Sequence, residues 1–360
     1  MSDTKQRFLF LVVSYHTINF FRPIIKKLLA RGHKVRVISI DPLPKGAFED
    51  KFDAHQQDWH LFCWEKIENY DPTRVVVFNG SFGVINAATQ ALKKKYPLFC
   101  AEVAWFPQSE NIYIDRSIHH LSNICLEAVF TGHGYKQNQE AIERLEPVIK
   151  RLQEKYKPRA KPPSTVDRNK SVLIPLQLEQ DTSILYSSPH FKTMESLIGF
   201  ALYSLPNTAQ VVVKPHPKMD VPYFKKKIGR TLLNKIIFFE DRSYTLNDLV
   251  YHSRMVMGIN STGLMEALIH NRPVYQMGKN ICSAAIDDLD KDQVRKFYRD
   301  YCYMGMQEEY FREQRNKARI LTMMANQFKY SDPPEWVIHK LENFTTSART
   351  LGDLLRDENL

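Results

Sequence analysis

Residues 7–40 read RFLFLVVSYHTINFFRPIIKKLLARGHKVRVISI, and this stretch decides the fold. Its first part, Arg7 to Val13, is a continuous apolar run of the kind that forms a strand buried on both faces of a parallel sheet. From Ile18 to Ala30 apolar residues recur in pairs every four positions, which predicts a helix with one apolar face. An Arg-Gly-His turn follows, and Lys34 to Ile40 predicts a second strand. The stretch therefore predicts a β-α-β unit with a right-handed crossover.

The same alternation continues along the chain in two series. The first adds strands at 74–78, 97–103 and 126–130 and helices at 84–94 and 137–156. Residues 157–170 read KPRAKPPSTVDRNK, with three prolines and no apolar periodicity, which is typical of a linker. The second series has strands at 171–176, 210–213, 235–240, 255–258 and 273–277, with helices between them.

This organisation predicts an α/β protein of two Rossmann-like domains that face each other across a cleft. The first domain is expected over residues 1–156, the linker over 157–170 and the second domain over 171–310. Residues 311–360 are expected to be helical, and a return of these helices to the first domain is left open.

Composition narrows the class of protein. A chain of 360 residues with 43% hydrophobic and 25% charged residues fits two globular cores. No apolar run approaches the roughly 18 to 20 residues that span a bilayer, and we expect a cytoplasmic protein. The five cysteines form no C-x-x-C pair, so neither a disulfide framework nor a zinc site is indicated.

The net charge of +10 is compatible with nucleic acid, an anionic membrane face or an anionic substrate. The basic residues are scattered, with short clusters at 93–95 and 225–227, and no nucleic-acid-binding module is recognised. We expect no nucleic-acid partner. Work at the cytoplasmic face of the inner membrane, on a phosphorylated lipid or a polysaccharide, is compatible with the charge.

The first candidate site follows a predicted strand, where Val212 to Pro217 reads V-V-K-P-H-P. Two prolines fix a rigid turn that presents Lys214, His216 and Pro217 at the carboxyl end of the strand, the edge where open α/β sheets bind ligands. A lysine and an imidazole there suit a nucleotide phosphate. A proline-kinked loop with a capping histidine is the alternative.

A second candidate site follows the strand at 255–258, where Asn260, Ser261, Thr262 and Gly263 precede a predicted helix. Hydroxyls and backbone N–H groups at a helix start bind anions, although Ser and Thr are also ordinary N-caps. Glu266, one turn later, is placed to accept hydrogen bonds from a ribose.

Two carboxylates complete the set. Asp181 lies in the stretch Gln177 to Ile184 just after the first strand of the second domain, and Glu102 ends the strand at 97–103. Each alone is an ordinary capping or surface acid, but two acids on opposite walls of a cleft suit glycosyl transfer. No D-x-D on an apolar strand, G-x-G-x-x-G, Walker A, G-x-S-x-G or H-E-x-x-H occurs, so no metal site is predicted.

Together these motifs resemble a known family. Q-x-x-x-D-x-S-I (Gln177, Asp181, Ser183, Ile184), K-P-H-P at 214–217 and N-S-T-G-x-x-E-A-L at 260–268 resemble the bacterial capsule-polysaccharide transferases that add β-Kdo from CMP-Kdo. The opening residues and Phe78-Asn79-Gly80 are similar to the same group, so the resemblance spans most of 7–280. The H-P motif and the paired hydroxyls also recur in bacterial sialyltransferases that use CMP-sialic acid.

The resemblance implies a GT-B fold and a metal-independent, retaining glycosyltransferase with no cofactor besides its donor, CMP-Kdo. It implies CMP bound by His216, Ser261 and Thr262, Asp181 as nucleophile and Glu102 as acceptor base. It also implies a surface-polysaccharide, lipopolysaccharide or other glycolipid acceptor. The family follows that base with Asp or Asn and Gly, whereas this chain has Glu102-Val103-Ala104-Trp105, so Glu110 and Asp115 are alternative bases.

Three other functions stay open at this point. A transferase of the same fold could use CMP-sialic acid, a UDP-sugar or a GDP-sugar. A catalytically inactive GT-B protein could act as a scaffold in a polysaccharide-assembly complex. A nucleic-acid-binding role would require a contiguous basic stripe and binding that weakens steeply with salt.

Overall fold

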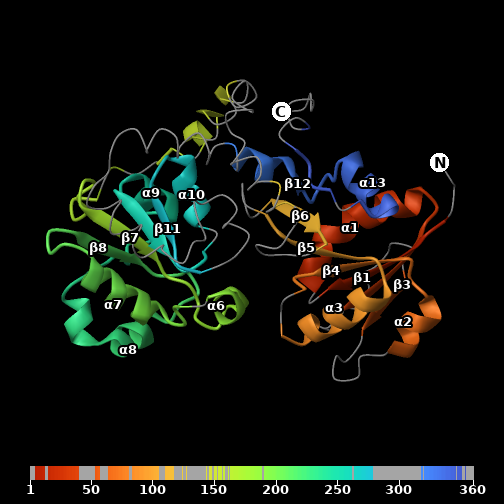
Figure 1. Ribbon diagram of the computed structural model, residues 1–360, viewed down its shortest axis with the longest axis horizontal. Helices are drawn as coiled ribbons and strands as arrows, with labels where there is room; N and C mark the ends of the chain where they lie inside the picture. Colours follow the sequence, from red (N-terminus) through yellow and green to blue (C-terminus); the bar gives the residue numbers. More distant parts are fainter. Residues whose placement is uncertain are drawn as a thin grey trace. The chain divides into compact units, whose positions relative to one another are not determined.

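The computed structural model describes two compact units of the chain (Figure 1). The described residues are 5–12, 15–39, 53–56, 64–80, 83–104, 110–116, 124, 127, 143, 146, 147, 150, 151, 153–155, 157, 158, 161, 163–188, 190–261, 263–278, 318, 320–345, 347–350 and 353. One unit takes in Met1–Ile124 and Asn326–Ala348, and the other Cys125–Ala325 and Arg349–Leu360. This grouping starts the second unit before the linker at 157–170; the domain boundaries given above stay predictions.

The first unit is built on a sheet with the strand order β12-β6-β5-β4-β1-β2-β3 among the described residues. The five strands from β3 to β5 run parallel in the order of a Rossmann fold, and β6 and β12 add antiparallel pairs. Their bounds are β1 Arg7–Val12, β2 Lys34–Ser39, β3 Asp53–Gln56, β4 Arg74–Phe78, β5 Leu98–Val103, β6 Asn111–Asp115 and β12 Gln327–Lys329.

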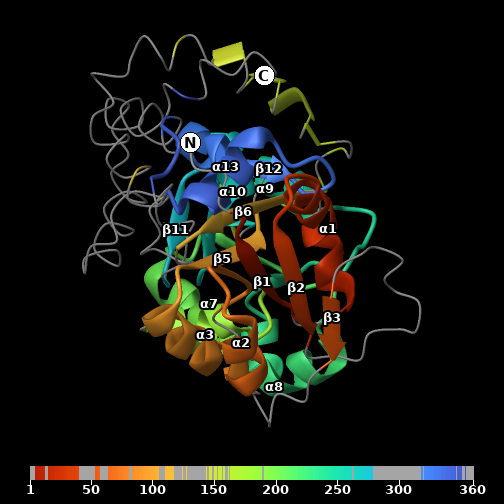
Figure 2. The same cartoon turned by 90° about the vertical axis from the view of Figure 1, so that its right-hand side faces the viewer.

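Helices cover both faces of this sheet (Figures 1 and 2). On one face α1 (Tyr15–Ala30) and α13 (Glu335–Asn343) pack on alternate residues of the central strands, such as Phe8 and Phe10. On the other face lie α2 (Trp64–Tyr70) and α3 (Gly83–Lys95). The C-terminal α13 thus supplies part of the core of a unit formed mainly by the N-terminal third of the chain.

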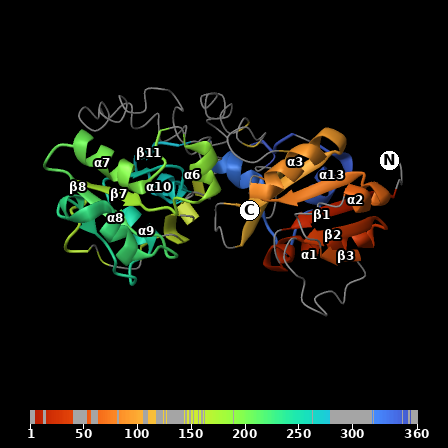
Figure 3. The same ribbon diagram turned by 90° about the horizontal axis from the view of Figure 1, so that it is seen from below.

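The second unit has an all-parallel sheet with the order β11-β10-β7-β8-β9 among its described residues. The strands are β7 Ser171–Pro175, β8 Gln210–Lys214, β9 Ile237–Phe238, β10 Met255–Gly258 and β11 Val274–Gln276. Helices α7 (Met194–Ser204) and α8 (Val221–Leu233) cover one face, and α9 (Leu246–Tyr251) and α10 (Leu264–Ile269) the other (Figures 1 and 3). The short α6 (Thr182–Ser187) follows β7.

The strand order decides where this unit binds a ligand. The chain leaves β7 to one side, through α7, to reach β8, and later places β10 on the other side of β7. In open α/β sheets ligands generally bind where the order reverses, which in this sheet is outside the carboxyl ends of β7 and β10. The candidate residues 177–183 and 260–266 follow these two strands.

The fold class predicted from the sequence, α/β with two Rossmann-like units, is confirmed. The strand predicted at 126–130 is wrong at its described position, because Glu127 is helical; its other residues lie outside the described ones. Burial raises the pKa of Cys100 to about 12, as befits an inert structural thiol. None of the described helices is long and apolar enough to cross a membrane.

The packing of α13 in the first unit can be tested by mutation. Ile338 is fully buried against the sheet, whereas the neighbouring His339 is exposed. Ile338→Ala should lower the free energy of unfolding by about 2–5 kcal/mol, because it leaves a cavity in the core. His339→Ala, measured in the same urea titration followed by circular dichroism, should change it by less than about 0.5 kcal/mol. Equal stability of the two variants would show that α13 does not contribute to this core.

Candidate functional site

The K-P-H-P turn holds its histidine in one orientation. Nδ1 of His216 accepts a hydrogen bond from the backbone N–H of Lys218 at 3.1 Å, so the neutral ring carries its proton on Nε2. The backbone carbonyl of His216 accepts from the N–H of Met219 at 2.9 Å. Burial lowers the pKa of His216, and Lys218 lowers it further. At neutral pH the imidazole is therefore an uncharged donor through Nε2–H.

Lys214 ends β8 beside this turn. Its ammonium donates to the backbone carbonyl of Asp241 at 2.8 Å and lies 5.4 Å from the ring centroid of Phe239. Burial lowers the pKa of Lys214. The carbonyl of Lys214 accepts from the N–H of Leu176 at 2.8 Å, which joins the carboxyl ends of β8 and β7. The lysine is thus held in place with its charge near the edge of the sheet.

Gln177 and Asn260 bond to each other. Nε2 of Gln177 donates to Oδ1 of Asn260 at 3.0 Å, and the backbone N–H of Asn260 donates to Oε1 of Gln177 at 3.1 Å. Nδ2 of Asn260 donates in turn to the carbonyl of Ser183 at 2.7 Å. Only 7% of Gln177 and 2% of Asn260 is exposed. These amides tie the ends of β7 and β10 to α6, and their role as nucleotide ligands stays a prediction.

Asp181 begins α6, and its Oδ1 accepts from the N–H of Ser183 at 2.8 Å. The residue is exposed, and its charge raises the pKa of His216, an effect smaller than that of burial. The loop before it is fastened by Glu179, whose carboxylate accepts from the N–H of Met194 at 3.0 Å and from Nζ of Lys227 at 2.5 Å. Asp181 therefore follows a loop that hydrogen bonds hold in place, at the same edge of the sheet as His216.

Ser261 and Gly263 form the turn that follows β10. Oγ of Ser261 accepts from the N–H of Gly263 at 3.1 Å. A Cβ at Gly263 would lie 2.5 Å from Cδ2 of Leu246, so a larger residue there would have to displace the Leu246 side chain. Thr262, the third predicted ligand in this turn, lies outside the described residues. Glu266 is largely buried within α10, and burial raises its pKa to about 7.

A cavity of about 610 Å³ lies where these loops meet. It brings together four of the predicted ligands, which are Lys214, His216, Pro217 and Ser261. Gln177, Asp181, Ser183, Asn260, Gly263 and Glu266 are not among its lining residues. The structure thus divides the predicted set into residues that face the cavity and residues that hold or flank its walls.

The loop between β9 and α9 adds lining residues that sequence analysis missed, among them Arg242, Tyr244 and Thr245. The carboxylate of Asp241 turns this loop by accepting from the N–H and Oγ of Ser243 at 2.9 and 2.7 Å. Thr245 and Asp248 close it with a capping box. Among the described residues, Arg242 has no hydrogen-bonding or ionic partner. The T-x-x-D capping pattern can be read from the sequence. Whether the loop contacts the cavity cannot, because that depends on the position of β9 beside β8 in the sheet.

The cavity is positively charged. Lys214 and Arg242 are its cations, and the one carboxylate in its lining, Glu240, forms an ion pair with Lys225. Proline, leucine and tyrosine side chains supply apolar wall. Among the described residues no group of three or more His, Cys, Asp or Glu is placed to hold a metal ion, and the expectation of a metal-independent site stays a prediction.

In the first unit, the three candidate bases lie in different surroundings. Asp115 pairs in register with Cys100, toward the amino end of β5, and is fully buried. Its carboxylate accepts from the N–H groups of Arg116 and Ile124 at 2.8 and 3.3 Å, so it supports the fold and does not face solvent. Glu102, near the carboxyl end of β5, and the exposed Glu110 are the candidates that the geometry favours.

Comparison with known proteins adds a family and a fold. Residues 112–292, half of the chain, match the model of a family described as capsule polysaccharide biosynthesis protein. A KpsC β-Kdo 2,7-transferase structure from Thermosulfurimonas dismutans is similar over 94% of this chain and 99% of that one, with 16% identity and a TM-score of 0.53. A β-Kdo 2,4-transferase structure of KpsC from the same organism covers 76% and 80%, with 14% identity and a TM-score of 0.43. A search of curated proteins finds no match.

The buried Glu266 predicts a pH-dependent stability. Its raised pKa means that the folded protein keeps a proton that the unfolded chain releases above about pH 4.5, so stability falls as the pH rises from there to about 7. Glu266→Gln removes this loss. The free energy of unfolding of Glu266→Gln minus that of the parent should therefore increase between pH 5 and pH 8. The increase should be on the order of 2 kcal/mol.

Urea titrations at the two pH values measure this difference. Glu195→Gln, which changes a carboxyl in the first turn of α7 of the same unit, is the matched control. A difference between Glu266→Gln and the parent that does not depend on pH would contradict the burial of a protonated carboxyl.

Proposed function

We propose that this chain, which belongs to the family of capsule polysaccharide biosynthesis proteins, is a glycosyltransferase that moves Kdo from CMP-Kdo to a surface-polysaccharide or glycolipid acceptor. The observation that supports this most strongly is the cavity at the carboxyl edge of the second sheet. Its volume of about 610 Å³ lies in the usual range for small-molecule sites. It combines cations and hydroxyls with apolar walls, as a nucleotide requires.

Each part of a nucleoside monophosphate has a partner in this arrangement. The phosphate oxygens accept hydrogen bonds from Arg242 and Lys214, from Nε2–H of His216 and from the hydroxyl of Ser261. A neutral histidine fits this role because it donates without changing the charge of the site. The proline, leucine and tyrosine walls contact the ribose and the base. Thr262 and Glu266 stay predicted ligands.

Asp181 is the proposed nucleophile. With Oδ1 held by the N–H of Ser183, its other oxygen attacks the anomeric carbon of the donor. The bond from that carbon to the phosphate breaks, CMP leaves with the electron pair, and a covalent glycosyl-enzyme forms. An acceptor hydroxyl then attacks the same carbon and restores the carboxylate, while Glu102 or Glu110 takes its proton. Two displacements retain the configuration of the sugar.

The cations of the cavity assist departure of the nucleotide. Charge develops on the phosphate oxygens as the bond to the sugar breaks, and donors already aimed at those oxygens stabilise the transition state. Lys214 is fixed by Asp241 and Phe239 before any ligand arrives, so it needs little reorganisation. We propose that Lys214 and Arg242 together supply the positive charge that a divalent ion provides in other transferases.

Activity is tested with CMP-Kdo generated in situ and a panel of glycolipid acceptors, followed by mass spectrometry. The parent should add one Kdo to an acceptor, and Asp181→Ala should lower kcat by about a thousandfold or more because no covalent intermediate forms. CMP binding should persist in Asp181→Ala, since Asp181 does not line the cavity. Glu195→Ala, on α7 of the same unit, controls for loss of a carboxylate.

Two further results would separate the alternatives. Transfer from CMP-sialic acid, a UDP-sugar or a GDP-sugar in place of CMP-Kdo would keep the transferase and change its donor. Unchanged polysaccharide assembly with the Asp181→Ala protein would favour a scaffold and remove the enzymatic proposal.

A further inference from the structure

The cavity at the carboxyl edge of the second sheet extends across four strands. Ser261 follows β10, Lys214 ends β8 and Glu240 follows β9, and β7 lies between β10 and β8. Neighbouring strands lie about 4.8 Å apart, so the ends of β10 and β9 are separated by about 14 Å. The phosphate and the base of one nucleotide can therefore contact different strands of this sheet.

Positive charge and hydroxyl groups are gathered at the end of the cavity beside β10. Leu246 begins α9, and a Cβ at Gly263 would lie 2.5 Å from its Cδ2, so α9 starts beside the turn that follows β10. Arg242 and Thr245 come from the loop that leads into α9, and Ser261 comes from the turn itself. We expect the phosphate at this end of the cavity.

The other end, beside α8, is apolar and carries one carboxylate. Met219, Val221 and Pro222, at and just before the first turn of α8, line it with apolar side chains. Glu240 lies beside this helix, because its carboxylate forms an ion pair with Lys225, one turn after Val221. An apolar wall with a single acceptor group suits a planar base that carries an exocyclic amino group.

Hydrogen bonds and an ion pair hold Glu240 in place. The N–H of the residue before it donates to the carbonyl of Val213, and the carbonyl of the residue after it accepts from Nζ of Lys214, both at 2.8 Å. Nζ of Lys225 lies 4.9 Å from the ring centroid of Phe238 and donates to Oε1 of Glu240. Oε2 of Glu240 has no hydrogen-bonding partner among the described residues, and the side chain is 48% exposed. A fixed acceptor is thus available to a ligand.

We propose that Glu240 selects cytosine over uracil by accepting a hydrogen bond from the exocyclic amino group of the base, an inference that rests on the function proposed above. An ionised carboxylate accepts hydrogen bonds and donates none. Cytosine presents an amino group where uracil presents a carbonyl oxygen, so the same carboxylate attracts one base and repels the other. The ion pair with Lys225 offsets the charge of Glu240, so the cavity still attracts the phosphate.

Isothermal titration of the whole chain with CMP and with UMP tests this assignment. The parent should bind CMP at least about tenfold more tightly than UMP. Glu240→Gln presents either an amide oxygen or an amide N–H at this position, so it should bind the two nucleotides with similar affinity. Loss of a merely structural group would weaken both nucleotides alike and leave the ratio of their affinities unchanged.

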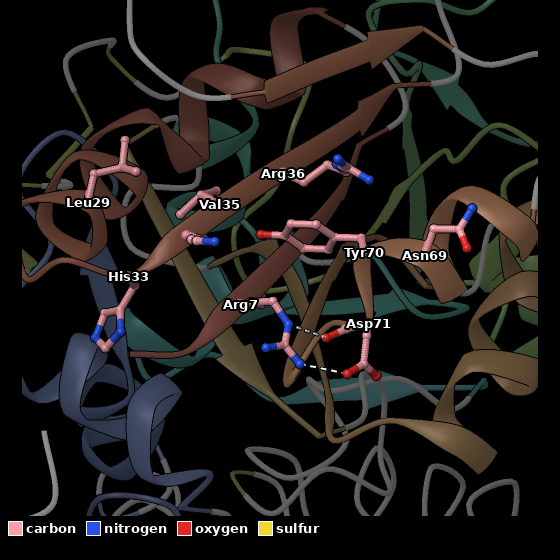
Figure 4. Close-up of a pocket in the computed structure, with 9 residues that line it drawn as sticks. Arg7, Leu29, His33, Val35, Arg36, Asn69, Tyr70 and Asp71 are labelled. Carbon is pink, nitrogen blue, oxygen red and sulfur yellow. Dashed lines mark hydrogen bonds and ion pairs between the residues drawn. The ribbon is translucent and has the colours of Figure 1, made fainter. Parts of the chain in front are cut away.

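Asp71→Asn is the matched control, because it also changes the one carboxylate in the lining of a cavity. That cavity, of about 630 Å³, belongs to the first unit, and Oδ2 of Asp71 accepts there from Nη2 of Arg7 at 2.6 Å (Figure 4). Asn tolerates the left-handed backbone at this position, where φ is 47°. The variant should bind CMP and UMP as the parent does. Thermal unfolding followed by circular dichroism checks that both variants fold.

The outcomes separate the role of Glu240 from the proposed function. If the parent prefers CMP and Glu240→Gln keeps that preference, or weakens both nucleotides equally, the role of Glu240 is wrong and the proposed donor stands. If the parent binds UMP as tightly as CMP, the site does not select cytosine, and the role of Glu240 is wrong whatever the donor. Absence of CMP binding in the parent would contradict the proposed function as well.

Discussion

The buried side chains of Gln177 and Asn260 hydrogen-bond to each other at the carboxyl edge of the second sheet. The arrangement of the candidate site in the second unit depends on this pair. Their mutual hydrogen bonds join the carboxyl ends of β7 and β10, where the strand order reverses, and the bond from Asn260 to the carbonyl of Ser183 adds the helix that Asp181 begins. A buried amide without a partner costs about 1–3 kcal/mol, so this network favours one arrangement of the crevice. The K-P-H-P turn and Ser261 lie at the same edge of the sheet and line the cavity there.

Hydrogen bonds and an ion pair also hold the charged and titratable groups at this edge. Lys214 is bonded to Asp241, His216 is kept neutral by burial and oriented by Lys218, and the one carboxylate in the cavity lining is paired with Lys225. What remains for a ligand is positive charge and donors, with Arg242 having no partner among the described residues. A nucleotide phosphate satisfies such a surface, and charge that grows on that phosphate during transfer is stabilised by it.

Sequence reasoning succeeded where burial on both faces of a sheet leaves a continuous apolar run. The strands at 74–78 and 255–258 were predicted with the bounds that the structure has. It missed β12, because three residues cannot show periodicity and their partner strand lies some two hundred positions earlier. Lys214 and His216 were readable because prolines mark their turn. Arg242 was not, and the mutual hydrogen bonds of Gln177 and Asn260 could not be foreseen because they depend on tertiary structure.

The most direct measurement of the central claim is the affinity of the protein for CMP, by isothermal titration, in the parent, Arg242→Gln and Arg230→Gln. Arg230 carries the same charge at an exposed position of α8 and does not line the cavity, so its variant should bind as the parent does. Arg242→Gln should weaken binding by about tenfold to a hundredfold, or 1.4 to 2.8 kcal/mol. Absence of CMP binding in the parent, or equal affinity of all three proteins, would contradict the account.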